Sequence, residues 1–129
     1  MSKRASMIRA HFEAWNARDR EGMVRDLAED VVVEEDQGFQ VAAGVSHGHA
    51  GVFALWDQLF EVSDDARTEV LEIDELEDGR ILVLMTMHAT MRQSGISGSL
   101  EMAHIWHMRG EKVARVQVFG SHEAARAAL

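Results

Sequence analysis

Residues 102–119, MAHIWHMRGEKVARVQVF, place histidines where a β-hairpin normally packs aliphatic side chains. Apolar and polar residues alternate on either side of a glycine, which is typical of a half-buried antiparallel hairpin. His104 falls on the same strand face as Trp106. A neutral histidine N–H can polarise a carbonyl group or hold an enolate without the cost of a buried charge. Two interpretations stay open: His104 lines a cavity, or it is a core histidine with satisfied ring nitrogens.

A second histidine lies on a predicted helix. In RASMIRAHFEAWNA, residues 4–17, His11 shares one helical face with three apolar residues: Ile8, Phe12 and Trp15. Such a face packs against the rest of a domain. His11 therefore either turns a free ring nitrogen to the interior or caps the core with its second nitrogen bonded, and the sequence leaves both open.

Other motifs for chemistry are weaker. SHGHAG places His47 and His49 two residues apart, but no third metal ligand has a matching spacing, so a structural or capping role is favoured. HExxH, GxSxG and GxGxxG are absent, and the chain has no cysteine. Zincin chemistry, nucleophilic hydrolysis and dinucleotide binding therefore have no support, and we expect neither a metal nor a cofactor.

Bulk composition indicates one domain over residues 1–129, with 47% hydrophobic and 27% charged residues. The net charge of −9, without a basic cluster, argues against nucleic acid and anionic membrane surfaces as partners. No apolar run approaches the ~20 residues of a membrane helix, and the N-terminus lacks the apolar core of a signal peptide. The absence of cysteine fits a reducing compartment, so we expect a cytoplasmic protein.

Periodicity predicts helices first and a sheet afterwards. Helices are expected at 4–17, 19–29, 50–60 and 121–129, with Asp19 and Ser121 as N-caps, and a loop at 37–51. Strands are expected at 31–36, 66–76, 80–93, 97–109 and 112–119. This order predicts an α+β domain with the helices on the concave face of a curved sheet.

Two glycines predict how the strands pair. Gly79 suits a three-residue hairpin loop, which sets Ile73 opposite Val83 and Leu71 opposite Met85. Gly95 suits a two-residue turn that pairs Ser94 with Ser97. That turn sets Met87 opposite His104 and Met85 opposite Trp106.

The opposite face of the predicted sheet is also unusually apolar. It carries Leu82, Leu84 and Ile105, and the predicted helices do not cover it. An exposed apolar face of this kind marks an interface. We therefore expect a homodimer through the convex face of the sheet.

Three segments carry a resemblance to a known family: HFEAWNARDREGMVRDLAEDVVVEED (11–36), GHAGV (48–52) and AHIWHMRGEKVARVQVF (103–119). With the order of elements, they resemble the SnoaL-like branch of the nuclear transport factor two-like superfamily, which is similar to ketosteroid isomerases and polyketide cyclases. The resemblance covers nearly the whole chain. It implies a cone-shaped α+β fold, in which a strongly curved mixed or antiparallel sheet wraps around the N-terminal helices.

The resemblance also implies a site. In ketosteroid isomerases a tyrosine and a protonated carboxylic acid donate hydrogen bonds to an oxyanion, and their positions fall on His11 and His104. The proton-shuttling carboxylate falls on Glu35, although the strand alternation leaves open whether Glu35 or Asp36 faces the interior. This chain has no tyrosine, so the steroid isomerase set is not reproduced.

A carboxylate in an apolar pocket has a raised pKa and can accept a proton, so Glu35 as base, with His11 and His104 as hydrogen-bond donors, could move a proton next to a carbonyl group. We expect them in an apolar cavity of roughly a few hundred Å³. The expected ligand-binding residues are Trp15, Phe53, Trp56, Met87, Met102 and Trp106. The predicted partner is a hydrophobic small molecule. The alternatives are a dehydratase that uses His104 and Glu35, or a non-catalytic ligand-binding or dimerisation module.

Overall fold

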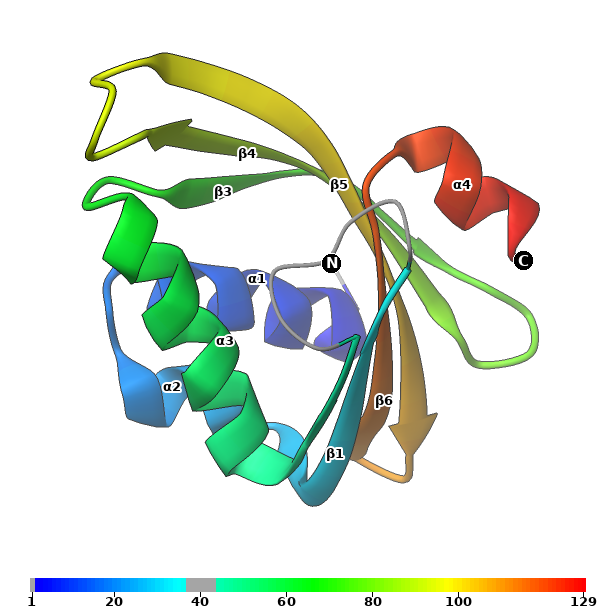
Figure 1. The fold of residues 1–129 in the computed structure, drawn as a ribbon. Coiled ribbons are helices and arrows are strands. Elements are labelled where there is room, and N and C mark those ends of the chain that lie inside the picture. Colours follow the sequence, from blue (N-terminus) through cyan, green and yellow to red (C-terminus); the bar gives the residue numbers. More distant parts are fainter. Residues whose placement is uncertain (1, 37–43) are drawn as a thin grey trace.

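One curved sheet organises the computed structural model, which describes residues 2–36 and 44–129 (Figure 1). The elements are α1 (Lys3–Asn16), α2 (Arg20–Val24), β1 (Leu27–Glu35), β2 (Val45–His47), α3 (Gly48–Val62), β3 (Arg67–Glu75), β4 (Ile81–Thr90), β5 (Ser97–Arg109), β6 (Lys112–Phe119) and α4 (His122–Ala127). The strand order is β2-β1-β6-β5-β4-β3. Neighbouring strands are antiparallel except β1 and β6, which are parallel.

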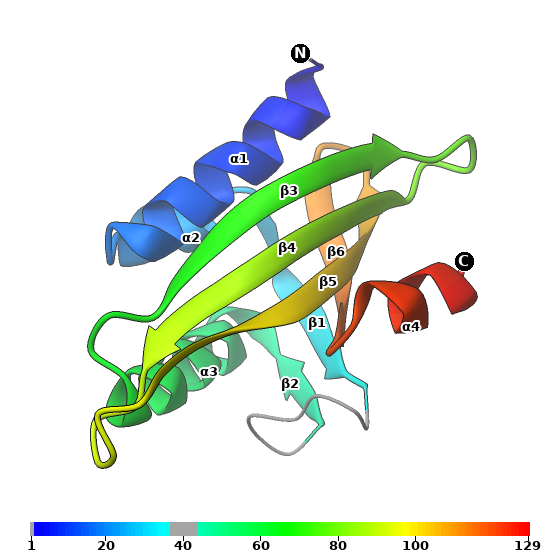
Figure 2. The same ribbon diagram turned by 90° about the horizontal axis from the view of Figure 1, so that it is seen from above.

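The helices divide between the two faces of this sheet. Figures 1 and 2 show α1 and α3 inside its curve and α4 on the outer side. Ile8 and Phe12 of α1 are buried in the same core as Val83 and Trp106 of the sheet. The predicted α+β cone with N-terminal helices inside the sheet is therefore confirmed. No helix among the described residues is long and apolar enough to span a membrane.

The predicted second helix is shorter than expected. Asp19 caps α2 as predicted, because its side chain accepts a hydrogen bond from the Gly22 amide. The helix ends at Val24, and Leu27 already begins β1, so the predicted helix over 19–29 is wrong at its C-terminal end. The cause is tertiary: β1 lies parallel to β6, with Val33 beside Val116, and strand pairing outweighs local helix propensity.

The predicted loop over 37–51 also contains regular structure. Residues 45–47 pair with β1 as the short strand β2, and α3 begins at Gly48. Gly48 has a φ of +69°, a backbone conformation that favours glycine. Residues 37–43 lie outside the described part of the chain.

The hairpin between β3 and β4 has the predicted turn and part of the predicted register. The Leu76 amide donates to the Arg80 carbonyl at 2.8 Å, and Ile73 lies opposite Val83. A β-bulge between Val70 and Glu72 then changes the phase, so Val70, not Leu71, lies opposite Met85. Leu71 is 50% exposed, and its predicted position in the core is wrong.

The hairpin between β4 and β5 has a longer connection than predicted. Thr90 and Ser97 form the last pair, so the two-residue turn at Gly95 is wrong. His104 lies opposite Val83 rather than Met87, and Trp106 lies opposite Ile81 rather than Met85. Both partners are four residues from the predicted ones. A shift by an even number preserves the face of every side chain, so His104 and Trp106 keep their predicted face.

The outer face has a core of its own. Leu82, Leu84 and Ile105 are buried within a single chain, with Phe119 and Ala125, beneath α4. Helix α4 begins at its predicted cap, since the Ser121 side chain accepts from the Ala124 amide. The expectation that no helix covers these side chains is therefore wrong. The homodimer stays a prediction, and these three residues no longer argue for it.

Candidate functional site

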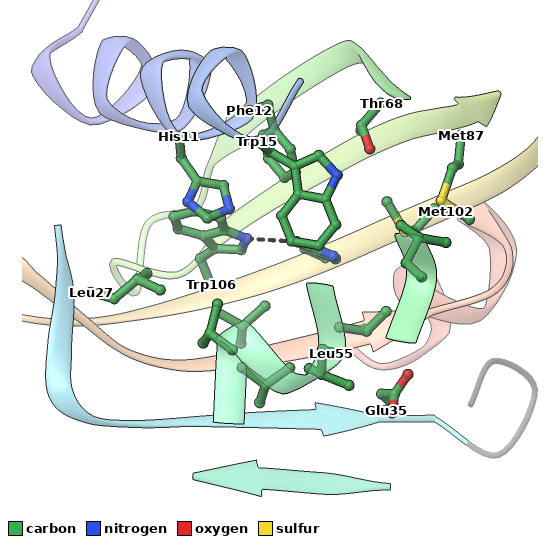
Figure 3. Close-up of a pocket in the computed structure, with 16 residues that line it drawn as sticks. His11, Phe12, Trp15, Leu27, Glu35, Leu55, Thr68, Met87, Met102 and Trp106 are labelled. Carbon is green, nitrogen blue, oxygen red and sulfur yellow. Dashed lines mark hydrogen bonds between the residues drawn. The ribbon is translucent and has the colours of Figure 1, made fainter. Parts of the chain in front are cut away.

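A cavity of about 100 Å³ lies between α1, α3 and the concave face of the sheet. It is smaller than the few hundred Å³ expected from the sequence. Of its sixteen lining residues, drawn in Figure 3, four carry polar or ionisable groups besides the indoles: His11, Glu35, Thr68 and His104. Three of these were predicted from the sequence, and Thr68 was not.

His104 is a neutral hydrogen-bond donor toward the cavity. Trp106, two residues along β5, donates its indole N–H to His104 Nδ1 at 3.0 Å. An indole nitrogen can only donate, so Nδ1 must accept and the ring proton must be on Nε2. Burial, reinforced by the proximity of His11, lowers the pKa of His104 to about 3. The ring is therefore uncharged at neutral pH.

His11 has the opposite hydrogen-bonding role toward the cavity, because its free nitrogen is an acceptor. Its Nδ1 lies 2.8 Å from the Met23 carbonyl oxygen, and a carbonyl can only accept, so Nδ1 carries the proton. Nε2 is then a bare acceptor, and the expected donation from His11 to a ligand does not fit the neutral ring. Burial lowers the pKa of His11 to about 4, although the bond to Met23 opposes the shift.

The two rings share aromatic neighbours, Phe12 and Trp106. The His11 ring is edge-on to Trp106, with centroids 5.0 Å apart. The His104 ring lies 5.6 Å from the Phe12 ring. Among the described residues neither Nε2 atom has a hydrogen-bond partner in the protein. The two histidines thus offer a ligand one acceptor and one donor.

Glu35 lies at the end of β1 and is the carboxylate in the cavity wall. The buried side chains of β1 alternate along the strand and include Val31, Val33 and Glu35. The Glu35 side chain is 9% exposed. Asp36 is exposed and does not line the cavity. Of the two acidic residues left open by the sequence, Glu35 and not Asp36 therefore faces the interior. Figure 3 shows Glu35 across the cavity from His11.

Four of the six predicted ligand-binding residues line this cavity: Trp15, Met87, Met102 and Trp106. Phe53 and Trp56 do not. The Arg20 guanidinium lies over both rings, 4.3 Å and 5.1 Å from their centroids. Helix α3 instead lines the cavity with Val52, Leu55 and Leu59. These three residues have the i, i+3, i+7 spacing of a helical face, so the predicted stripe was slightly rotated about the helix axis.

Thr68 is the polar lining residue that the sequence did not reveal. It lies on β3 and is 4% exposed. Counting back from Ile73 in steps of two places Thr68 on the outer face, but the bulge between Val70 and Glu72 reverses the phase. The sequence does not reveal this bulge. The inward position of Thr68 could have been inferred only by counting from apolar Val70, two residues further along the strand, in place of Ile73.

One of the two histidines considered as metal ligands has a structural role. His49 Nε2 donates a hydrogen bond to the Leu27 carbonyl oxygen at 3.0 Å. This bond fixes α3 to β1. Within residues 2–36 and 44–129 no three His, Asp or Glu side chains are grouped to hold a metal ion.

Similar proteins share this architecture. A nuclear transport factor two-like protein of unknown function from Burkholderia pseudomallei K96243 is 27% identical, with a TM-score of 0.82 and coverage of 98% of this chain and 97% of that one. TerC, co-crystallised with polyporic acid, is 25% identical, with a TM-score of 0.81 and the same coverage of 98% and 97%. A putative polyketide cyclase from Xanthomonas campestris pv. campestris is 20% identical, with a TM-score of 0.71 and coverage of 95% and 93%.

A family assignment follows from the sequence as well as from the fold. No curated protein matches the chain. The profile of the SnoaL-like domain matches residues 8–116, which include most of α1, the sheet except the end of β6, and most of the cavity wall. The chain therefore belongs to the SnoaL-like domain family.

Proposed function

We propose that this protein binds a small hydrophobic carbonyl compound in the cavity and catalyses cofactor-independent proton transfer on it. An isomerase, a cyclase and a dehydratase all use this step. The observation that carries the proposal is that one carboxylate and two neutral histidines line a single apolar cavity.

Each polar group has a distinct part in this proposal. His104 donates its Nε2–H to the carbonyl oxygen of the ligand, and Glu35 takes a proton from the neighbouring carbon. The negative charge then moves to the oxygen, where the hydrogen bond from His104 becomes stronger. His11 accepts a hydrogen bond from a ligand hydroxyl or from water through Nε2, because its Nδ1 proton is held by Met23.

The relatives support a small-molecule role at a coarse level. TerC was co-crystallised with polyporic acid, and this chain matches it over almost its whole length. A non-catalytic binding module is the second candidate, and the mostly apolar wall of the cavity favours it, because such a wall can hold a hydrophobic molecule without any chemical step.

The experiment uses 2-tetralone, a flat ketone with exchangeable hydrogens beside its carbonyl group. Proton NMR in deuterium oxide follows the replacement of these hydrogens, and calorimetry gives the affinity. We expect the protein to accelerate exchange, and Glu35→Gln to lower the acceleration about 100-fold or more with little change in affinity. Glu34→Gln is the matched control, because Glu34 is the adjacent residue and does not line the cavity.

Each outcome assigns a function. Binding that His104→Leu weakens, without accelerated exchange, supports the binding module. Exchange that Glu35→Gln leaves unchanged contradicts the proposed base. Failure of 2-tetralone to bind contradicts the proposal that this cavity takes small carbonyl compounds.

A further inference from the structure

Thr68 is clamped to α1 by the side chain of a single residue. The Thr68 amide donates to Asn16 Oδ1 at 2.8 Å, and Asn16 Nδ2 donates to the Thr68 carbonyl at 2.8 Å. The Thr68 amide and carbonyl therefore both have partners in Asn16. The Thr68 hydroxyl takes no part in these two bonds. Trp15 directly precedes Asn16, so the same clamp fixes the position of Trp15 relative to Thr68.

The side chains of these two residues have polar atoms without partners. Among the described residues neither Thr68 Oγ1 nor Trp15 Nε1 makes a hydrogen bond, and both atoms are buried. Leaving such atoms unpaired costs free energy, and valine would fill the space of Thr68 without that cost. Arg9 Nε and Trp56 Nε1 are unpaired too, but their residues do not line the cavity. Thr68 and Trp15 do line it.

Thr68 lies far along the sheet from His104. Thr68 is opposite Met87 and His104 is opposite Val83, so four residues of β4 separate them, which is about 13 Å along the strand. In Figure 3 the indole nitrogen of Trp15 and the hydroxyl of Thr68 lie on the same side of the cavity, across it from Glu35. The cavity therefore has polar groups in two separate places.

We propose that Thr68 and Trp15 form a second subsite, which binds an uncharged hydroxyl or carbonyl oxygen of the ligand. This inference rests on the proposed function, in which His104 holds the first carbonyl oxygen. An indole N–H donates, and a threonine hydroxyl donates or accepts, so together they satisfy one oxygen atom. The ligand class is thus a flat hydrophobic ketone with a second oxygen at its other end.

The subsite selects against a charged group at that end. Among residues 2–36 and 44–129 no cationic side chain lines the cavity, and the ionisable residues in its wall are His11, Glu35 and His104. A carboxylate at the second position would therefore lose its hydration without gaining a counter-charge. A phenol or ketone oxygen loses much less and gains two hydrogen-bond partners.

The test compares 2-tetralone with 6-hydroxy-2-tetralone, which adds a hydroxyl at the far end of the same ring system. Calorimetry on the full chain gives the dissociation constant of each. In the unsubstituted protein the added hydroxyl is expected to strengthen binding about fivefold to tenfold. Thr68→Val should abolish this gain, so that both ketones bind with about the same affinity, and Trp15→Phe should reduce the gain partly.

Two further variants serve as controls. Thr68→Ser keeps a hydroxyl at the same place and should retain most of the gain. Thr86→Val makes the same chemical change on β4 outside the cavity wall, and it should alter neither constant. A thermal melt of each variant checks folding, and Thr68→Val should melt at the same temperature or higher because it removes an unpaired buried hydroxyl.

The outcomes separate the subsite from the proposed function. If 2-tetralone binds and depends on His104, but the added hydroxyl gives no gain or the gain persists in Thr68→Val, the subsite is wrong and the carbonyl site stands. Equal weakening of both ligands in Thr68→Val also overturns the subsite, since it would show an effect of cavity shape. If 2-tetralone does not bind at all, the proposed function is wrong and the subsite is wrong with it.

Discussion

Adjacent glutamates on β1 show how the two faces of the sheet differ. Glu34 points outward and forms two hydrogen bonds to the Arg115 guanidinium, at 2.8 Å and 2.7 Å, which hold the pKa of its carboxyl below its usual range. Glu35 points inward and lines the apolar cavity. The chemistry of the two side chains is the same, so their different environments decide which one can act on a ligand.

The histidines follow the same division. On the outer face His107 Nε2 bonds to Gln117, and His88 bonds through both ring nitrogens to Ser99 and Glu69. On the inner face His11 and His104 each use one ring nitrogen within the protein and turn the other to the cavity. The outer histidines bond to side chains of the same sheet, whereas His11 and His104 each keep one ring nitrogen available for a ligand.

The largest expected effect comes from removing Trp106, which is 1% exposed and lies in the inner core. Trp106→Ala should lower the free energy of unfolding by about 3–5 kcal/mol in urea denaturation, because it leaves a large cavity and removes the partner of His104. Leu84→Ala, in the outer core beneath α4, should cost about 2–4 kcal/mol. A greater loss in Leu84→Ala than in Trp106→Ala would contradict this ranking of the two sites.

A smaller effect is expected from pH. The folded-state pKa values of about 4 for His11 and about 3 for His104 lie below the unfolded value of 6.5. The unfolded chain therefore binds protons first, and stability falls as the pH drops from 6.5 toward 4, by at most about 1.4 kcal/mol per pH unit for each histidine. Urea denaturation between pH 7 and pH 5 measures this slope.

His104→Leu isolates one part of that dependence. We expect its slope of stability against pH to be shallower than that of the unsubstituted protein, since one histidine no longer titrates. At pH 7 its stability should change by about 1 kcal/mol or less, because better apolar burial offsets the unpaired Trp106 N–H. An unchanged slope would show that His104 is not desolvated in the folded protein.

The smallest effect sharpens the contrast between the glutamates. Glu34→Gln should lower the free energy of unfolding by about 1 kcal/mol or less, because the ion pair with Arg115 is partly exposed. Glu35→Gln should change stability little, because the amide nearly keeps the size and shape of the carboxylate. A large loss of stability in Glu35→Gln would indicate a structural role for its carboxylate and count against the proposed base.

Periodicity in the sequence was enough to predict the helical face of His11 and the strand face of His104. Side chains alternate strictly along a strand, so even a four-residue error in the pairing of β4 and β5 kept His104 and Trp106 on the concave face. The caps at Asp19 and Ser121 were also predictable, because the helix start needs a side-chain acceptor at a fixed position. These are local properties of the chain.

Only the tertiary structure decided the details that set the chemistry. The bulge after Val70 turned Thr68 inward, and the packing of α3 turned Phe53 and Trp56 toward Arg20. The Met23 carbonyl made His11 an acceptor, and the Trp106 indole made His104 a donor. The bulge, the packing of α3 and the Met23–His11 bond depend on contacts between separate parts of the chain, and residue spacing carries no record of them. The Trp106–His104 bond joins neighbours on one strand face, but its direction depends on side-chain orientation, which residue spacing does not record either.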